Sequence, residues 1–270
     1  MQRTRVTQAV WERILKVKSG PACLCCGDWS QGERDALDLY GALAAPTKEP
    51  QFFAQIGQSL DGRVATQSGD AQDISGVDGL AHLHRLRALA DAVVIGVKTA
   101  LHDSPQLTVR LATGENPARV VIDPSGRLPN TAHLLQDDSV RRIVIQACDV
   151  PRPEGVEVIQ LKRDQWIAAT DIAEALRELG FRKVLVEGGA ITIAQFLEAG
   201  LLDRLHVAVA PLLIGSGPQG LPTSPVSSLA HAMRPETMTY HLGSDVLFDC
   251  GLAQSAPVAG LCRSNLAAGE

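Results

Sequence analysis

Two short segments of the sequence carry residue types that could bind an anionic ligand and move protons. Thr99–Arg110 places a hydroxyl, a carboxylate (Asp103) and a guanidinium within one connection that follows an apolar run. Glu187–Gly189 follows another apolar run and leads into a helical segment. Backbone N–H groups are left free at a helix N-terminus, and glycine lets a phosphate approach the backbone there. A carboxylate at the carboxyl end of a buried parallel strand faces the crevice where α/β sheets bind ligands.

Each segment alone has a simpler interpretation. Glu187–Gly189 could be an ordinary tight turn between a strand and a helix, and Thr99–Arg110 could be a solvated polar loop. Because both follow strands of the kind buried inside a sheet, a shared cleft is the better interpretation.

The elements that must position these segments begin after a proline-bounded linker, Pro46–Pro50. From there, short β-branched runs alternate with helical segments such as Asp171–Leu179 and Ala190–Ala199, which end at Gly180 and Gly200. Nearly continuous apolar runs are typical of strands buried on both faces of an α/β sheet. The expected strands are Phe52–Gln58, Ala92–Val97, Arg119–Asp123, Arg142–Ala147, Val156–Leu161, Lys183–Glu187 and Leu205–Ile214.

Three further segments predict secondary structure outside the apolar runs. Met238–His241 and Asp245–Asp249 flank a Leu-Gly-Ser turn and predict a closing antiparallel hairpin. Ser75-x-x-Asp78 resembles a capping box before a helix. Residues 1–49 are expected to form a helical extension, with helices at Gln8–Lys18 and Glu33–Ala45. The sequence does not indicate the function of this extension. We therefore expect a domain at 50–252, an α/β fold with a mixed sheet, and a flexible tail at 253–270.

Several motifs match a known pattern but lack the sequence context that the pattern needs. Gly215–Gly220 fits the dinucleotide-binding G-x-G-x-x-G, but that motif needs a helix to begin there. Pro218, Pro222 and Pro225 prevent a clean helix start, so this segment is predicted to be a flexible loop. Cys23–Cys26 contains one C-x-x-C, half of a zinc site, without a second Cys/His pair nearby, so we expect no metal. His82 and His84 are expected to be structural or exposed.

The composition excludes other classes. A net charge of −5 over 270 residues argues against a nucleic-acid-binding surface. No apolar run approaches the roughly 20 residues that span a bilayer, and no secretory signal is evident. Six cysteines are too sparse for a disulfide scaffold, so a cytoplasmic protein with reduced thiols is expected.

Residues 51–250 resemble the reductase domain of the bifunctional riboflavin-biosynthesis deaminase/reductase, a family with a dihydrofolate-reductase-like fold. The matching stretches include Ser59-Leu-Asp-Gly-Arg63, Leu86-Arg-Ala88, Asp103-Ser-Pro105 with Leu107-Thr-Val-Arg110, Val120-Val-Ile-Asp123, Val186-Glu-Gly-Gly189 and Ala210–Gly215. Residues 1–49, which precede this match, are unrelated to the deaminase domain, and a zinc-deaminase site would need an H-x-E that this sequence lacks, so we expect no deaminase activity.

The resemblance implies an NADPH-dependent reductase of a phosphoribosylamino-pyrimidine, with a three-layer fold and a homodimeric assembly. Asp103 would be the candidate for proton transfer. Two arginines could hold the sugar phosphate. By resemblance, NADPH would contact Gly57, Thr99, Asp103, Gly188, Gly189, Ala190, Ile191 and Thr192, and substrate would contact Arg87, Leu107, Arg110 and Glu187.

This sequence departs from the family pattern beside the expected site. Ala71 stands where a serine is usual, and Asp73 stands where the family has tryptophan. Pro124 replaces a serine that helps to bind the 2′-phosphate, for which Ser125 and Arg127 are candidate substitutes. Losing a buried hydrogen bond to a ligand costs about 1–3 kcal/mol, so two losses could change the preferred substrate.

Three hypotheses follow. The first is a stand-alone reductase of 5-amino-6-(5-phosphoribosylamino)uracil. The second is a related NADPH reductase for another pyrimidine, pterin or folate-like substrate, motivated by Ala71 and Asp73. The third is a non-catalytic nucleotide-binding or assembly protein. Four residues that are present count against it: Arg87, Asp103, Arg110 and Glu187.

Overall fold

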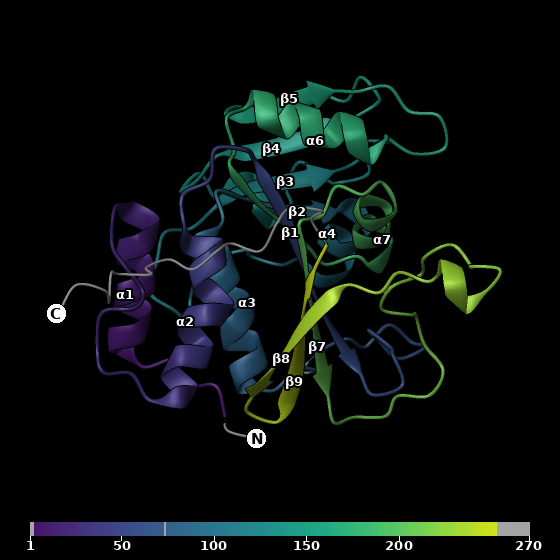
Figure 1. Cartoon of the computed structure of the whole chain (residues 1–270). Helices are drawn as coiled ribbons and strands as arrows, with labels where there is room; N and C mark the ends of the chain where they lie inside the picture. The colour runs from purple at the N-terminus through teal and green to yellow at the C-terminus, as the bar shows by residue number, and fades with distance from the viewer. Residues whose placement is uncertain (1–2, 73, 253–270) are drawn as a thin grey trace, which may run out of the picture. The chain divides into compact units, whose positions relative to one another are not determined.

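The computed structural model describes residues 3–72 and 74–252 (Figure 1). The chain divides into two compact units, one ending at Pro46 and one spanning Thr47–Leu252. This division lies three residues before the predicted start of the main domain at residue 50. Asp73 and the tail predicted for 253–270 lie outside the described residues.

The N-terminal unit contains two helices, α1 (Gln8–Ser19) and α2 (Gln31–Ala44), as the sequence predicts. The Thr7 side chain caps α1 by accepting from the Val10 N–H at 3.4 Å. The start of α2 is held by Glu33, whose Oε2 accepts from the Ser30 N–H at 3.0 Å. The sequence analysis overlooked this capping box, although its S-x-x-E pattern is readable.

The second unit is built on a nine-stranded sheet with the order β5-β4-β3-β2-β6-β1-β7-β9-β8. The first seven strands along the chain run parallel, β9 pairs antiparallel with β7, and β8 pairs antiparallel with β9. The strands are β1 (Gln51–Ser59), β2 (Ala92–Gly96), β3 (Ala118–Ile122), β4 (Arg142–Gln146), β5 (Val156–Gln160), β6 (Lys183–Glu187), β7 (Arg204–Ala210), β8 (Glu236–Leu242) and β9 (Asp245–Gly251).

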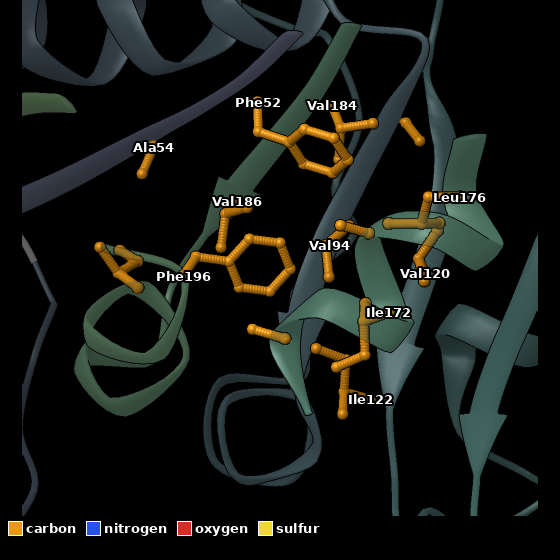
Figure 2. Close-up of a cluster of buried hydrophobic side chains, with 14 of the residues drawn as sticks. Phe52, Ala54, Val94, Val120, Ile122, Ile172, Leu176, Val184, Val186 and Phe196 are labelled. Atoms are coloured by element: carbon orange, nitrogen blue, oxygen red, sulfur yellow. The ribbon is translucent and has the colours of Figure 1, made fainter. Parts of the chain in front are cut away.

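Helices cover both faces of this sheet. On one face α6 (Ala169–Glu178) and α7 (Ala190–Glu198) pack over a continuous apolar core that includes Phe52, Val186 and Phe196 (Figure 2). Alternate strand residues point to the opposite face, where His206 of β7 lies 3.1 Å from His82 of α3 (Val77–Leu89) between their ring nitrogens. The remaining helices are α4 (Val97–Asp103), α5 (His133–Gln136) and the short 3₁₀ turn η1 (Leu229–His231). The predicted α/β fold with three layers, a mostly parallel sheet and a C-terminal antiparallel hairpin is confirmed.

Two local predictions were wrong. Ser75 does not cap α3, because the helix begins after Gly76, whose N–H donates to Asp245 Oδ2 at 2.9 Å. A tertiary contact thus replaces the local cap. The run predicted as a strand to Ile214 ends at Ala210, because the Asp61 carboxylate accepts from the backbone N–H groups of Ile214 and Gly215 beyond it.

The sheet order reverses near its middle, where β6 lies between β1 and β2. Because these three strands are parallel, their carboxyl ends meet at one edge. Such a reversal is where open α/β sheets bind ligands. The fold therefore brings the residues after β1, β2 and β6 together at one edge of the sheet.

Candidate active site

The floor of the site is a buried ion pair between helix α3 and strand β6. Arg87 Nε donates to Glu187 Oε2 at 2.8 Å, and Arg87 Nη2 donates to the other carboxylate oxygen. Arg87 Nη1 donates to the Thr108 carbonyl at 3.0 Å. Burial alone would lower the pKa of the Arg87 guanidinium, but Glu187 raises that pKa above its usual value. The pair holds the Glu187 carboxylate in one orientation at the end of β6.

This pair changes the interpretation of Arg87. Its guanidinium is engaged on three nitrogens by Glu187 and Thr108, and Arg87 does not line either pocket described below. The structure therefore gives Arg87 a positioning role for Glu187. Its predicted direct contact with substrate remains a prediction.

Next to Glu187, strand β1 contributes Gln55, which pairs with Glu187 in the sheet register. The Gln55 side chain is buried and lines the same pocket as the carboxylate. The sequence analysis overlooked Gln55, because a single glutamine in an apolar strand carries no motif. Its position beside Glu187 follows only from the pairing of strands far apart in the chain.

The glycine turn after β6 packs against helix α4. Gly188 and Gly189 have φ angles of 60° and 79°, a left-handed conformation that favours glycine. A Cβ on Gly188 would lie 2.9 Å from Thr99 Cγ2, and one on Gly189 would lie 2.9 Å from Thr99 Oγ1. Both the backbone conformation and the close approach of Thr99 therefore require glycine here.

Gly189 is also the N-cap of α7, and as a glycine it has no side chain that could cap the helix. Among the described residues, the N–H groups of Ala190 and Ile191 have no hydrogen-bond acceptor. Free N–H groups at a helix N-terminus can bind an anion. The geometry thus agrees with the expectation drawn from the Glu187–Gly189 segment.

A first pocket, which we call the polar pocket, has a volume of about 450 Å³ and lies at the carboxyl ends of β1 and β6. Its charged and polar side chains come from the strand ends and from α4. Ala71 lines it as well. The residues that carry the argument are Gln55, Gly57, Lys98, Thr99, His102, Asp103, Glu187 and Gly188.

A second pocket, which we call the basic groove, has a volume of about 300 Å³. It is lined by Ile191 and Thr192 of α7, by Trp166, and by residues that follow β3 and β5. Arg163 Nη1 donates to Ser125 Oγ at 2.6 Å, so two polar loops meet at one end of the groove. Arg127 and Pro124 line the same end.

The two pockets share a wall. Lys98, Thr99, Gly189 and Ala190 line both of them, together with Val64 and Pro218. A long ligand in the basic groove would therefore lie directly against a ligand in the polar pocket.

The carboxylate of Asp103 lies at the mouth of the polar pocket. It is exposed and 2.6 Å from His102 Nδ1. Asp103 is the last residue of α4, so the predicted single connection Thr99–Arg110 is in fact a short helix followed by a loop. The helix presents Thr99 and Asp103, one turn apart, to the same pocket.

The loop after α4 follows an unusual path. Ser104 and Leu107 have positive φ angles of 42° and 53°, a strained conformation for residues other than glycine. Leu107 is buried, and the exposed Arg110 donates to the side chains of Gln106 and Thr108. Neither Leu107 nor Arg110 lines the two pockets, so their contact with substrate remains a prediction.

The outcome for the predicted site is therefore uneven. Every residue predicted to contact the cofactor lines one of the two pockets, whereas among the predicted substrate contacts only Glu187 does so. Lys98 and Arg163 are additional pocket residues that the sequence did not single out. Arg163 could have been found from the sequence, because it comes shortly after a predicted strand, as Ser125 does.

Comparison with known proteins identifies the family that the chain matches. Residues 50–248 match the sequence profile of the RibD C-terminal domain. A 2,5-diamino-6-ribosylamino-4(3H)-pyrimidinone 5′-phosphate reductase from Methanothermobacter thermautotrophicus is 31% identical over 74% of this chain and 97% of its own length. The riboflavin biosynthesis protein RibD of Actinobacillus pleuropneumoniae is 30% identical over 80% of this chain, which spans only 61% of that relative.

Solved structures give the same result. A Thermotoga maritima deaminase/5-amino-6-(5-phosphoribosylamino)uracil reductase superposes with a TM-score of 0.68 at 25% identity, over 82% of this chain and 62% of that one. A pyrimidine reductase-like protein from Corynebacterium diphtheriae superposes at 0.62 and 22% identity, over 81% of this chain and 98% of that one, and supports the fold alone. Among the described helices, none has the length and apolar character required to cross a membrane.

Proposed function

The chain belongs to the RibD C-terminal domain family, and from this premise we propose that it reduces the ribosyl group of 5-amino-6-(5-phosphoribosylamino)uracil with NADPH. The product is the corresponding ribityl compound. The observation that carries the proposal is the wall that the polar pocket shares with the basic groove. It allows a cofactor and a substrate to meet.

The basic groove fits the cofactor. The glycine turn at Gly188 and Gly189 leaves a cradle beside Thr99 that side chains would fill. At the far end, Ser125, Arg127 and Arg163 offer a hydroxyl and two guanidinium groups, which suit a 2′-phosphate. Ser125 and Arg127 therefore remain the candidate substitutes for the serine that Pro124 replaces, and Arg163 joins them. This set favours NADPH over NADH.

The bound cofactor would supply a hydride. The protein must then hold the ribose C1′ against the shared wall. When the ribosylamine ring opens, C1′ becomes an imine carbon, and hydride addition there leaves the former ring oxygen as a hydroxyl. That reaction needs a fixed substrate and one proton.

The polar pocket can both hold the substrate in place and supply the proton. Glu187, fixed by Arg87, can accept hydrogen bonds from sugar hydroxyls, and Gln55 can bind beside it. Asp103 at the pocket mouth can pass a proton to or from the ring oxygen directly or through a water. Lys98, which lines both pockets, can interact with an anionic group of either ligand.

A second substrate is favoured by one specific observation. The M. thermautotrophicus reductase, which this chain covers over 97% of its length, is named for the 2,5-diamino-pyrimidinone rather than the uracil. Both compounds share the phosphoribosylamino group on which the proposed chemistry acts.

The test is reductase activity of the purified protein, followed as loss of NADPH absorbance at 340 nm with each pyrimidine in turn. We expect turnover with the uracil compound and a higher kcat/KM for it than for the diamino compound. The reverse preference would move the assignment to the second substrate. No turnover with either, while NADPH still binds, would favour another pyrimidine, pterin or folate-like substrate, and failure to bind NADPH would favour a non-catalytic protein.

We also propose that the protein is a homodimer located in the cytoplasm. Apolar side chains on β7 and β9, Val207, Val209 and Phe248, are partly exposed and adjacent in the sheet register. Sedimentation analysis should give twice the chain mass, and Phe248→Asp should shift it to the monomer. A monomeric parent protein would contradict the assembly and leave the reductase proposal untouched.

A further inference from the structure

Two thiols of a C-x-x-C segment lie close together in the loop between α1 and α2. Cys23 Sγ is 2.7 Å from Cys26 Sγ, and the Sγ atom of Cys25 is 3.3 Å from the first and 4.0 Å from the second. Cys25 and Cys26 are exposed, and Cys23 is partly exposed, so small molecules can reach the sulfurs. The family match begins at residue 50, so this loop lies outside the part of the chain that the family describes.

Packing on the inner side of the loop holds this segment on the two helices. The Leu24 side chain lies directly over Gly41 of α2, where a Cβ would come 2.2 Å from Leu24 Cδ1. Arg13 of α1 donates from Nη1 to the Cys23 carbonyl at 3.3 Å. Each helix therefore contributes one contact that fixes the backbone from which the thiols project.

The separation of the two sulfurs distinguishes a disulfide-forming pair from a pair of metal ligands. Thiolates that share one metal ion at about 2.3 Å keep their sulfurs about 3.8–4.0 Å apart. The sulfurs of Cys23 and Cys26 are much closer, at 2.7 Å. A disulfide bond is about 2.05 Å long, so the two sulfurs need to approach by less than about 1 Å to form one. The geometry of this pair fits a disulfide better than a shared metal ion.

Cys23 also has the acidity of an attacking thiol. Hydrogen bonding with the Cys26 thiol, and to a smaller extent with the Cys25 thiol, lowers the pKa of Cys23 to about 7. The thiolate is the form that attacks a disulfide, and the best attacking thiol has a pKa near the ambient pH. At neutral pH roughly half of the Cys23 side chains are therefore in the reactive form.

We propose that Cys23 and Cys26 form a reversible dithiol–disulfide couple that exchanges with low-molecular-weight disulfides such as oxidised glutathione. The Cys23 thiolate attacks one sulfur of the external disulfide, which releases one thiol and leaves a mixed disulfide at Cys23. Deprotonated Cys26 then attacks the Cys23 sulfur, forms the internal bond and displaces the second thiol. Two protein thiols are oxidised, one external disulfide is reduced to two thiols, and the two protons pass to the released thiols.

The test equilibrates the full-length protein anaerobically with mixtures of reduced and oxidised glutathione and then blocks the remaining thiols with N-ethylmaleimide. Trypsin cleaves after Lys18 and Arg34, so one peptide carries the three cysteines of the loop. Under oxidising mixtures we expect this peptide to contain one internal disulfide and a single maleimide group, on Cys25. Excess reduced glutathione should return it to the form with three maleimide groups.

Serine variants then identify the reacting pair. Cys23→Ser and Cys26→Ser should each lower the equilibrium constant for internal disulfide formation at least a hundredfold, because the sulfur pairs that remain are farther apart. Cys25→Ser should keep that constant within about threefold of the parent value. Cys148→Ser, which changes a partly exposed thiol outside the loop, is the matched control and should behave as the parent.

The peptide map of the parent protein decides the pairing without any substitution, and it does not depend on reductase activity. The proposal is overturned if glutathione adds to the loop without forming the internal disulfide, or if the bond joins Cys25 or a cysteine outside this peptide. It is also overturned if the serine variants at Cys23 and Cys26 oxidise as the parent does. A stoichiometric metal ion in the purified protein that prevents oxidation of the pair would contradict it as well.

Discussion

The polar pocket and the basic groove lie side by side but are held together in different ways. In the polar pocket, the Glu187 carboxylate is fixed by a buried ion pair that joins strand β6 to Arg87 of helix α3. The basic groove ends in Arg127 and Arg163, which are exposed on loops after β3 and β5. A fixed carboxylate can orient a reacting group, whereas exposed cations can select a ligand by its charge. We infer that one region determines the reaction and the other determines the cofactor.

The largest expected effect is on the buried pair. Arg87→Met leaves the Glu187 carboxylate buried without its partner, so the free energy of unfolding should fall by about 3–5 kcal/mol. Glu174→Gln, which removes the exposed partner of Arg177, should change it by less than about 1 kcal/mol. Urea denaturation of both variants measures the difference. Equal losses in the two variants would show that the polar pocket is not held by its ion pair.

The double variant Arg87→Met/Glu187→Leu sharpens this result. Removing both charges should recover part of the lost stability, because no unpaired buried charge remains. Its reductase activity should nevertheless be absent, since Glu187 itself is gone. Recovery of both stability and activity would contradict the role of Glu187.

The next largest effect is expected at the turn shared by the two pockets. Gly189→Ala adds a Cβ 2.9 Å from Thr99 Oγ1 at a φ of 79°, so NADPH affinity should fall at least tenfold. Gly180→Ala is the matched control, because Gly180 has a φ of 84° but open space around it. Both changes should destabilise the fold by about 1 kcal/mol through the backbone strain. Fluorescence titration with NADPH compares them, and equal affinities would remove this turn from the cofactor site.

A smaller and more selective effect is expected in the basic groove. Arg163→Ala should raise the KM for NADPH about ten- to hundredfold, because a charged hydrogen bond contributes about 1.5–3 kcal/mol. The KM for NADH and the kcat with either cofactor should change little, because NADH has no 2′-phosphate. Arg141→Ala, at an exposed pair with Glu157, is the control. Equal loss with both cofactors would contradict selection by charge in this groove.

The last prediction concerns the pH dependence of stability, to which two histidines behind the polar pocket contribute. Burial, with added repulsion from His206 and Arg85, holds the pKa of His82 well below its usual value. Burial and the nearby Arg87 lower the pKa of His84 to about 4. Both histidines belong to α3, the helix behind the polar pocket.

The unfolded chain binds protons at these histidines below its usual pKa of about 6.5, while the folded chain does not. Stability should therefore fall as the pH drops below about 6.5, by up to about 1.4 kcal/mol per pH unit from His82 alone. The contribution of His84 should end near its folded pKa of about 4. Urea midpoints at several pH values should give a flatter slope for His82→Gln than for the parent protein. Equal slopes in the two proteins would contradict a neutral, buried His82.

Much of the fold was predictable because buried parallel strands are apolar over their whole length. The runs ending at Gly96 and Glu187 needed only that pattern, and Gly180 and Gly200 marked the ends of α6 and α7 by their positive φ angles. The failures at Ser75 and Ile214 share one cause. In both places an aspartate more than 150 residues away in the chain takes the backbone hydrogen bonds that a local pattern seemed to assign.

The site divides in the same way. The glycine turn, Thr99 and Asp103 were predictable because they follow strands in the chain. The engagement of Arg87 with Glu187 joins residues 100 positions apart, and Gln55 faces the pocket through strand pairing. Spacing in the sequence does not report such contacts, and the predicted contacts of Arg87, Leu107 and Arg110 with substrate stay predictions.

The central claim is that hydride passes across the wall shared by the two pockets. It is tested most directly by reducing the phosphoribosylamino-uracil with NADPH deuterated at C4, using the two C4 diastereomers separately, and weighing the product. We predict one deuterium at C1′ of the ribityl product from one diastereomer and none from the other. Product without deuterium from either form, or no product from a protein that binds both ligands, would contradict the account.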